Sequence, residues 1–287
     1  MIRRRLLSGA IILCLSACLC LGAIQYRAVR AWEECAVKLP IIMYHSILKD
    51  PKYTGKYVIT PDQLEQDLIY LTENGYTTVT VQDLINHVQG TASLPEKPIM
   101  LTFDDGYYNN YLYAYPLMKK YQCKMVLAVI GIQSEKYSKT QETNAYYSHI
   151  TWEQMKEMTD SGLVEIQNHS YDMHSLNKGR NGSKRKQGES SAAYEASLTN
   201  DLSSLQKLFQ ENLDYVPSAY VYPFGAISAD SKSIIKKLGF LASFSCEARI
   251  NVITQDPECL YLLGRYLRPS GTTSDAYFKK ILKEAAS

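Results

Sequence analysis

The sequence predicts an α/β fold in which β/α units surround a parallel sheet or barrel. From Leu39 onward, short apolar runs rich in Ile, Val and Tyr alternate with amphipathic stretches. The alternation continues for about 250 residues without an internal repeat, which favours one β/α barrel over two separate domains. The 31 basic and 29 acidic residues nearly cancel, so an electrostatic nucleic-acid binder is excluded and no nucleic-acid partner is expected.

Seven apolar runs are predicted to form strands. They cover residues 39–44, 76–80, 98–103, 124–130, 163–167, 219–223 and 240–245. Four amphipathic stretches carry helix start and stop signals. The first opens at Thr60-Pro61 with Gln63, a capping box with proline in the first turn, and Gly75 ends it. The others are delimited by Thr151 with Gln154 and Gly162, by Ser228 and Leu238-Gly239, and by Ser274 and Glu284.

The N-terminus predicts export. Three arginines precede Leu6–Ile24, nineteen residues without a charge, which is typical of an export signal or of a membrane anchor. Leu15-Ser16-Ala17-Cys18 resembles the lipobox of bacterial lipoproteins, in which the cysteine is lipidated. A cleaved, secreted form is the third alternative, and mass analysis of the mature N-terminus distinguishes the three. We therefore expect a signal or anchor over 1–27, a linker over 28–38 and an extracytoplasmic domain over 39–287.

Four cysteines lie in the exported body, and their spacing matches no zinc-binding pattern. They are Cys35, Cys123, Cys246 and Cys259. We interpret them as small buried hydrophobic residues, with a disulfide between Cys246 and Cys259 as the alternative.

Segment 177–191 interrupts the β/α alternation. It contains five basic residues and almost no apolar ones, which predicts a long, exposed basic loop. It is either a tolerated surface insertion, or a lid or contact for an anionic polymer.

Two carboxylates follow the apolar run 98–103 directly, in Asp104-Asp105-Gly106. Successive residues of a strand point to opposite faces, so both carboxylates can serve one site only if the chain turns there. Gly106 permits that turn. Alone, this tripeptide is more often a turn or a helix cap.

Histidines follow another predicted strand, since residues 163–167 lead into a segment that holds His169 and His174. On a helix, a separation of five residues would rotate the two rings apart by about 140°, whereas a loop can converge them on one ion. Two imidazoles near a carboxylate form a common ligand set for a divalent metal. His45 and Pro223-Phe224-Gly225 also follow predicted strands, and in β/α barrels active sites lie at that rim.

Together these motifs resemble the polysaccharide deacetylases, the NodB-homology domain of carbohydrate esterase family four. Thr102-Phe103-Asp104-Asp105-Gly106 matches the first motif of the family in full. His169 and His174 match the second, with one extra residue between the histidines. That spacing, with Met43-Tyr44-His45 and Tyr222-Pro223-Phe224-Gly225, is similar to the branch that deacetylates partly β-1,6-linked poly-N-acetylglucosamine. The resemblance spans about residues 39–270.

The resemblance implies a distorted (β/α)7-type barrel that holds one divalent metal ion. The implied ligands are Asp105, His169 and His174, and Asp104 is the implied catalytic base. Zinc is the expected metal, with nickel, cobalt or iron as alternatives, because mixed nitrogen and oxygen sites accept several ions. The oxyanion and substrate side is assigned to Tyr222, Pro223 and Phe224, with the Phe224 N–H as the donor.

Two departures from the family pattern concern the base and the general acid. Val221 stands where an arginine often precedes the third motif, so we expect another group to tune the base, and Arg265 is the candidate. No histidine follows His174, so the usual C-terminal general acid is absent. His45 is expected to take that role.

The predicted function is metal-dependent N-deacetylation of N-acetylglucosamine units in an extracellular or cell-wall polysaccharide, with release of acetate. The partner is thus an acetylated glycan polymer, and the enzyme is expected to be a monomer tethered to the membrane by its N-terminal segment or by a lipidated Cys18. One alternative is a non-catalytic glycan-binding wall protein on the same barrel. The others are a peptidoglycan or chitin deacetylase and an O-acetyl xylan esterase.

Overall fold

Parallel strands form the centre of the protein. The computed structural model describes residues 36–176 and 179–286. The main sheet has the strand order β10-β9-β8-β7-β6-β2-β12, and β5 pairs with β6 beside this path. Its strands are β2 (Ile41–Tyr44), β5 (Thr77–Thr78), β6 (Pro98–Phe103), β7 (Met125–Val129), β8 (Val164–Asn168), β9 (Ala219–Val221), β10 (Ala242–Phe244) and β12 (Tyr266–Leu267). Every pairing among these strands is parallel, which confirms the predicted class of sheet.

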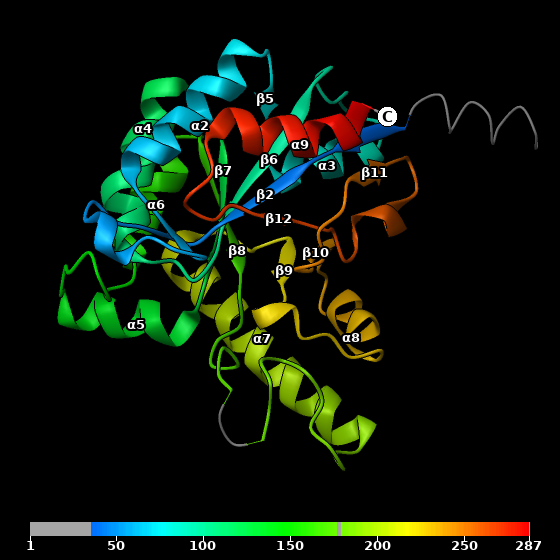
Figure 1. The fold of residues 1–287 in the computed structure, drawn as a ribbon. Helices are drawn as coiled ribbons and strands as arrows, with labels where there is room; N and C mark the ends of the chain where they lie inside the picture. The colour runs from blue at the N-terminus through cyan, green and yellow to red at the C-terminus, as the bar shows by residue number, and fades with distance from the viewer. Residues whose placement is uncertain (1–35, 177–178, 287) are drawn as a thin grey trace, which may run out of the picture. The chain divides into compact units, whose positions relative to one another are not determined.

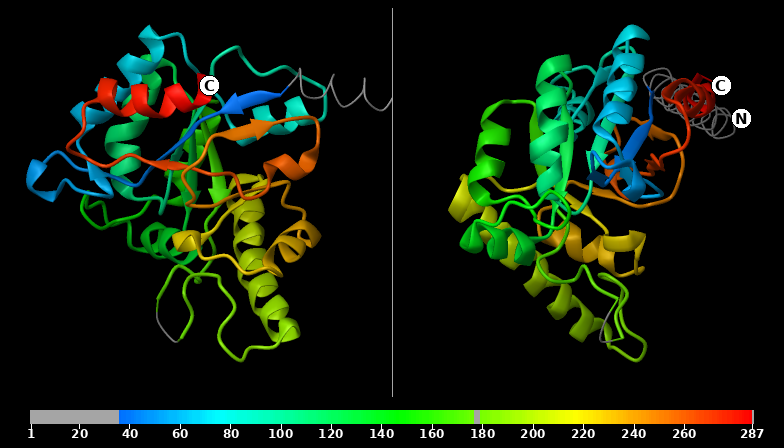
Figure 2. Two further views of the ribbon diagram at one scale, coloured as in Figure 1. Left: turned by 45° about the vertical axis from the view of Figure 1, so that its right-hand side comes forward. Right: turned by 60° about the vertical axis from the view of Figure 1, so that its left-hand side comes forward.

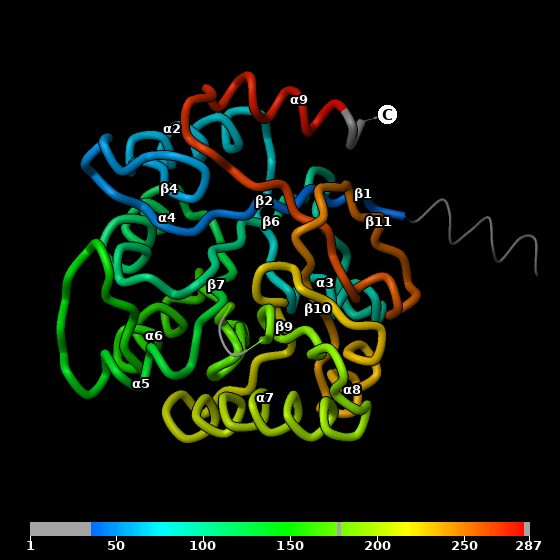
Figure 3. Tube along the Cα trace, turned by 60° about the horizontal axis from the view of Figure 1, so that its bottom comes forward, coloured from blue at the N-terminus to red at the C-terminus, as the bar shows by residue number. Residues whose placement is uncertain are grey.

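Helices surround the sheet, and Figure 3 shows α2, α4, α6, α7 and α8 around the strands. The α-helices are α2 (Pro61–Glu73), α3 (Val81–Val88), α4 (Tyr115–Tyr121), α5 (Gly131–Thr140), α6 (Trp152–Asp160), α7 (Ser191–Leu213), α8 (Ser231–Lys237) and α9 (Ser274–Ala286). Short helical segments are η1 (Pro51–Tyr53), the π-helical η2 (Asn110–Ala114), η3 (Pro223–Gly225) and η4 (Pro257–Leu260). Four further strands lie outside the main sheet: β1 (Val37–Leu39), β3 (Ser46–Ile47), β4 (Val58–Ile59) and β11 (Asn251–Ile253).

The two ends of the sheet approach each other. The Ser245 N–H donates to the Leu263 carbonyl and the Leu263 N–H donates to the Ser243 carbonyl, each at 2.8 Å. These bonds join the end of β10 to the segment just before β12, so the sheet curls, as expected for a (β/α)7-type barrel. Figure 2 shows α9, in red, and α7, in yellow-green, on opposite sides of the strands.

The apolar core explains why the strands could be predicted. All residues of β6 and of β7 are buried, as required of strands in a parallel sheet that helices cover. On α2, Leu64, Leu68 and Leu71 are fully buried and belong to the same core cluster as these strands. Their spacing places them on one face of the helix. Helix α2 therefore packs against the sheet along its apolar stripe (Figure 1).

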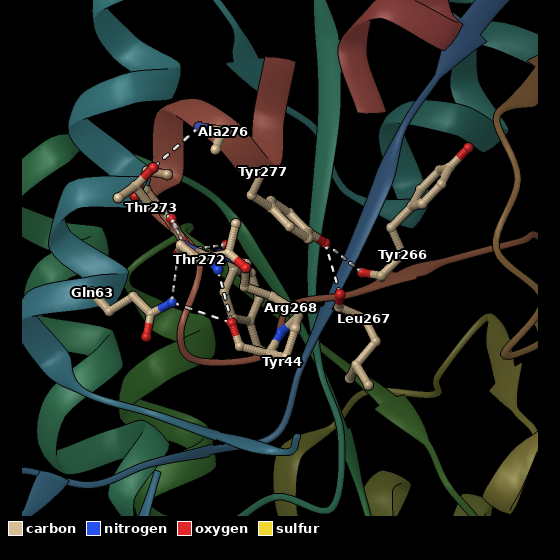
Figure 4. Close-up of polar contacts among 12 residues, drawn as sticks. Tyr44, Gln63, Tyr266, Leu267, Arg268, Thr272, Thr273, Ala276 and Tyr277 are labelled. Atoms are coloured by element: carbon tan, nitrogen blue, oxygen red, sulfur yellow. Dashed lines mark hydrogen bonds and ion pairs between the residues drawn. The ribbon is translucent and has the colours of Figure 1, made fainter. Parts of the chain in front are cut away.

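The start of α2 agrees with the prediction only in part. Thr60 Oγ1 accepts a hydrogen bond from the Gln63 N–H, and Pro61 is the first helical residue. Gln63 does not return the bond that a capping box requires. Its Nε2 donates instead to the carbonyls of Pro269 and Thr272, as Figure 4 shows. The glutamine thus ties the start of α2 to the segment before α9. The reciprocal capping box is present at Thr151 and Gln154, where one was expected.

A buried ion pair holds the C-terminal segment against α2 and β2. The Arg268 guanidinium binds both carboxylate oxygens of Asp67, through Nε and Nη2 at 2.9 Å each. The Tyr44 hydroxyl donates to the same carboxylate at 3.1 Å. Arg268 and Asp67 are both buried. A buried charge is tolerated only when it is paired and hydrogen-bonded, and these contacts meet that condition. Figure 4 shows Tyr44 and Arg268 beside the end of β12.

One predicted helix start is wrong. Helix α8 begins at Ser231 and not at Ser228. The Ser228 hydroxyl accepts a hydrogen bond from the Arg185 N–H of a distant loop, so it is not available to cap the helix. The last helix, α9, runs from Ser274 as predicted and extends two residues beyond Glu284. Strand β12 was not predicted, because two residues carry no periodic pattern.

The predicted signal or anchor, 1–27, Cys18 and most of the predicted linker lie outside the described residues. Within 36–176 and 179–286, no helix has the length and apolar character that a membrane span requires.

Candidate active site

The predicted site residues come from strand ends that lie at one edge of the sheet. Tyr44 pairs with Phe103 in the parallel register of β2 and β6, so the residues that follow them, His45 and Asp104, leave the sheet together. Val129 pairs with Asn168 in β7 and β8, and His169 follows Asn168 directly. The carboxyl ends of parallel strands are where α/β proteins build their sites.

Asp105, His169 and His174 converge as a possible metal centre. One ligand atom from each residue lies within 4.8 Å of the other two. Asp105 Oδ1 is 3.1 Å from His174 Nε2 and 3.6 Å from His169 Nε2. One carboxylate oxygen and two imidazole nitrogens form a donor set that suits zinc and similar divalent ions. The residues present therefore fit a divalent metal.

The ring of His169 is oriented by the backbone of β9. Its Nδ1 lies 2.7 Å from the Val221 carbonyl, which can only accept, so Nδ1 carries the proton and Nε2 faces Asp105. A hydrogen bond of this kind fixes the tautomer and the direction of a metal-ligating histidine. Burial alone would raise the pKa of Asp105, but its contacts with His169 and His174 outweigh this and hold the pKa well below the usual range. Asp105 is therefore an anion, as a metal ligand must be.

Arg265 pairs with the other carboxylate of the motif. Its Nη1 lies 2.7 Å from Asp104 Oδ1 and its Nη2 lies 2.9 Å from Asp104 Oδ2. The Arg265 side chain is fully buried, and its Nε donates to the Ser245 carbonyl. Burial alone would raise the pKa of Asp104, but the Arg265 guanidinium and His169 reverse the shift, and the pKa lies below its usual value. Asp104 is thus held ionised, as a proton acceptor must be.

His45 stands next to this pair. Its Nε2 lies 4.0 Å from Asp104 Oδ2, and its side chain is 15% exposed. Burial lowers the pKa of His45, against the opposing effect of Asp104 and Asp105. The ring of Tyr57 contacts the His45 ring, with the centroids 4.8 Å apart. The imidazole is therefore neutral at neutral pH and close enough to Asp104 for a water or a small shift to connect them.

The chain turn at the two carboxylates uses more than Gly106. Gly106 has φ 67°, and a Cβ there would lie 2.9 Å from Val129 Cγ1. Asp105 itself has φ 71°, a left-handed conformation that is costly for any residue except glycine. His149, which the sequence interpretation missed, supports this conformation: its Nδ1 lies 2.8 Å from the Asp105 carbonyl. It comes from a loop 44 residues away, and an isolated histidine gives no sequence signal.

A cavity of about 610 Å³ opens onto these groups. The described residues that line it are Met43, His45, Ser46, Lys56, Tyr57, Val58, Asp104, Asp105, Tyr107, His169, His174, Phe224, Cys246 and Leu267. Phe224 is 46% exposed, and its ring centroid lies 4.4 Å from that of His174. The cavity therefore combines the candidate metal ligands, the candidate base and apolar rings, as a substrate pocket does.

Tyr222 and Pro223, unlike Phe224, do not line the cavity. Tyr222 is fully buried, and its hydroxyl donates to Ser231 Oγ on α8 at 2.9 Å. Pro223 is buried as the first residue of η3. Their expected role in contacting substrate is therefore replaced by a structural one: they hold the turn that presents Phe224.

The alternative disulfide is absent. Cys123, Cys246 and Cys259, the cysteines of the described chain, are all free. Cys246 lines the cavity, with its Sγ 3.8 Å from Arg265 Nη2, whereas the Cys259 thiol donates to the Thr254 carbonyl. Of the three, Cys123 is the buried one, so the interpretation of the cysteines as buried hydrophobic residues holds there only.

Most of the described part of the basic loop is exposed, as predicted, but two of its residues are not. Gly182 and Ser183 are buried, and a Cβ at Gly182 would lie 2.7 Å from the Pro223 carbonyl. Ser183 contributes its carbonyl to a hydrogen bond from the Tyr194 hydroxyl. The described part of the loop therefore packs on the turn that carries Phe224, and the composition did not reveal this because small residues make the contact.

Comparison with known proteins supports this description. A family model for polysaccharide deacetylase matches residues 91–243. The Bacillus subtilis (strain 168) protein YxkH, which carries a provisional polysaccharide deacetylase name, is 30% identical over 250 residues, 86% of this chain and 78% of that protein. The poly-beta-1,6-N-acetyl-D-glucosamine N-deacetylase of Staphylococcus aureus (strain MRSA252) is 26% identical over 233 residues, 81% of this chain and 73% of that protein. The solved structure of a de-N-acetylase from Aggregatibacter actinomycetemcomitans has a TM-score of 0.71 and 26% identity, and the match covers 84% of this chain and 99% of that one.

Proposed function

Because the chain belongs to the polysaccharide deacetylase family, we propose that it acts outside the cytoplasm on a glycan of the poly-β-1,6-N-acetylglucosamine type. As a member of that family it hydrolyses the acetyl amide bonds of acetylated sugars. The observation that carries the proposal is the convergence of Asp105, His169 and His174 beside an ionised Asp104 in one cavity. The glycan is inferred from the names of relatives such as the Staphylococcus aureus enzyme. The export signal expected over 1–27 suits a polymer too large to enter a cell.

Asp105, His169 and His174 would hold the metal, which we propose to be zinc. When bound, such an ion lowers the pKa of a water molecule far below its value in bulk water, toward about 7, and polarises the acetyl carbonyl. The other tasks of amide hydrolysis fall to the protein: accepting the proton of the attacking water, stabilising the oxyanion and protonating the departing amine. Without that last step the amine is a poor leaving group.

Asp104 is the proposed proton acceptor. Arg265 occupies both of its carboxylate oxygens and thereby fixes its orientation and keeps it ionised. The neighbouring Asp105 faces the two histidines instead. The two adjacent carboxylates thus take different tasks because their surroundings differ.

His45 is the proposed donor to the departing nitrogen. Since burial keeps its imidazole neutral, the proton has to arrive during the reaction, and Asp104 at 4.0 Å is positioned to supply the one it takes from water. Phe224 has φ 57° in a turn next to His174. Its N–H is the proposed oxyanion donor, a contact that is typically worth about 3 kcal/mol.

The experiment that tests the function is acetate release from a panel of acetylated glycans, with zinc, nickel, cobalt or iron added to the metal-stripped protein. The panel contains β-1,6-linked and β-1,4-linked N-acetylglucosamine oligomers, peptidoglycan fragments and acetylated xylan. We expect the highest kcat/KM on the β-1,6-linked oligomers. A preference for another glycan would reassign the substrate, and binding without any acetate release would identify a non-catalytic glycan-binding protein.

Replacing His45 by alanine is expected to lower kcat about 100-fold, the lower end of the usual contribution of a positioned acid. We expect no larger loss of kcat, because the His45 side chain is 15% exposed and bulk water can partly replace it as a proton donor. The measurement is the rate of acetate release at saturating substrate, with bound metal quantified in parallel. Metal content should not change, because His45 is not among the three candidate ligands. An unchanged rate would reject His45 as the acid.

A further inference from the structure

Two exposed tyrosines from loops far apart in the sequence contact each other. Tyr53 lies in η1, between β3 and β4, and Tyr146 lies in the loop between α5 and α6. Their ring centroids are 5.1 Å apart, with the planes inclined by 60°. The two residues remain 47% and 53% exposed. Figures 1 and 3 show the two loops, blue and green, on the same side of the molecule. A single exposed ring is ordinary, but a pair assembled from two loops is an apolar surface of defined shape.

Buried Asn109 fixes both loops to the chain that follows the two carboxylates. Its Oδ1 accepts from the Ile47 N–H at 2.9 Å, and its Nδ2 donates at 2.8 Å to Ser46 Oγ and to the Ala145 carbonyl. Ile47 leads into the loop of Tyr53, and Ala145 directly precedes Tyr146. Asn109 is fully buried, so these bonds form away from competing water. The tyrosine pair is therefore held in a set position relative to Asp105, four residues before Asn109.

The pair lies within reach of the cavity. Tyr57 lines the cavity and contacts His45. Tyr53 is four positions before Tyr57 in the sequence, so their Cα atoms are at most about 14 Å apart. On the other loop, the Ser148 carbonyl accepts a hydrogen bond from the Tyr108 N–H, next to cavity-lining Tyr107. A polymer that places one unit in the cavity can thus extend over Tyr53 and Tyr146, whereas a single sugar cannot.

We propose that Tyr53 and Tyr146 form a second sugar-binding subsite, which holds another unit of the glycan chain whose neighbour occupies the cavity. The inference rests on the proposed function. Sugars present apolar C–H faces, and a tyrosine offers an apolar ring with a polar tip. Because the rings are already positioned, little conformational entropy is lost on binding. The subsite gives the enzyme a preference for long chains over short ones.

The test compares β-1,6-linked N-acetylglucosamine oligomers of two and six units. In Tyr53→Ala and in Tyr146→Ala, we expect KM for the hexamer to rise about tenfold, the upper range of one aromatic contact, with kcat within twofold. KM for the dimer is expected to stay within twofold. Phenylalanine at either position should retain hexamer affinity, because the ring makes the contact. In Tyr53→Ala/Tyr146→Ala the effects should not add, because each ring supports the other.

Tyr147→Ala is the matched control. Tyr147 lies in the same loop and is 49% exposed, but its hydroxyl contacts Glu142 and its ring is not the one that meets Tyr53. An equal rise in KM for this variant would mean that any change in the loop weakens binding, and would overturn the subsite. An unchanged hexamer KM in the double variant would overturn it too. If the wild type releases no acetate, the proposed function fails, and calorimetric binding of the hexamer to the same variants still decides the subsite.

Discussion

The His174→Ala variant is expected to lose both metal retention and acetate release. Altering a residue that only supports a ligand typically lowers metal affinity 10- to 100-fold, so removing a ligand should cost more than about 100-fold. Of the two candidate histidine ligands, His174 places its Nε2 closer to Asp105 Oδ1, at 3.1 Å, and two remaining ligands cannot hold the ion against a chelator. The measurements are zinc content after dialysis against EDTA, with readdition of metal, and acetate release at limiting metal. Asp105→Ala should give the same two losses.

His87→Ala is the control for these variants. His87 is also a buried histidine, in the last turn of α3, and it does not belong to the candidate metal centre. This variant is expected to keep its metal and its rate. A His174→Ala protein that kept full zinc content and full activity would remove the metal assignment, and with it the role proposed for Asp105.

The convergence of the candidate metal ligands could be predicted because each of them lies in a segment that follows a predicted strand. The run 98–103 is almost wholly apolar, and 163–167 alternates apolar and polar residues after Leu163; they match β6 in full and β8 to within one residue. A parallel sheet brings the carboxyl ends of such strands together whatever their separation in sequence. Asp105 and His169 therefore met as expected. The local turn was only half predicted, since Asp105 as well as Gly106 adopts positive φ.

The groups that support the site carried weaker signals or none. Arg265 was only a candidate, because it precedes a two-residue strand and contacts Asp104 from 161 residues away. The ring nitrogen of His149 contacts the backbone carbonyl of Asp105. Because every residue has a backbone carbonyl, such a contact leaves no pattern of residue types in the sequence. Tyr222 was misassigned because motif membership does not say which way a side chain points. Its hydroxyl is bonded to Ser231 on α8, away from the cavity.

Replacing Arg265 by methionine is expected to damage both stability and catalysis. The change leaves the Asp104 carboxylate buried without its partner, which lowers the free energy of unfolding by about 3–5 kcal/mol. Burial is then no longer opposed by the guanidinium, so we expect the pKa of Asp104 to rise above its usual value and a larger fraction of the base to be protonated. We expect acetate release at pH 7 to fall at least about 100-fold and to recover partly as the pH is raised. The measurements are urea unfolding of the metal-free protein and a pH–rate profile of the loaded enzyme.

The dependence of stability on pH should reverse in this variant. In the wild type the folded pKa of Asp104 lies below its unfolded value, so the pair stabilises the fold above the unfolded pKa and the contribution is lost as the pH falls. In Arg265→Met the folded pKa lies above the unfolded value, so the penalty is present at neutral pH and is relieved as the pH falls. The variant should therefore be more stable at pH 5 than at pH 8. If the free energy of unfolding of Arg265→Met depended on pH in the same way as that of the wild type, Arg265 would not control the pKa of Asp104.

Arg268→Met separates the structural effect from the catalytic one. Arg268 also forms a buried two-point pair with an aspartate, but Asp67 lies in α2 and outside the cavity. Breaking this pair should cost a similar 3–5 kcal/mol. At temperatures where the variant is folded, however, its kcat should stay within threefold of the wild-type value. Its pH–rate profile should match that of the wild type, because Asp104 is still paired with Arg265. The two substitutions lie three residues apart and remove the same chemical group. If both shifted the profile equally, loss of stability alone would explain the effect, and Arg265 would have no separate role in holding the base ionised.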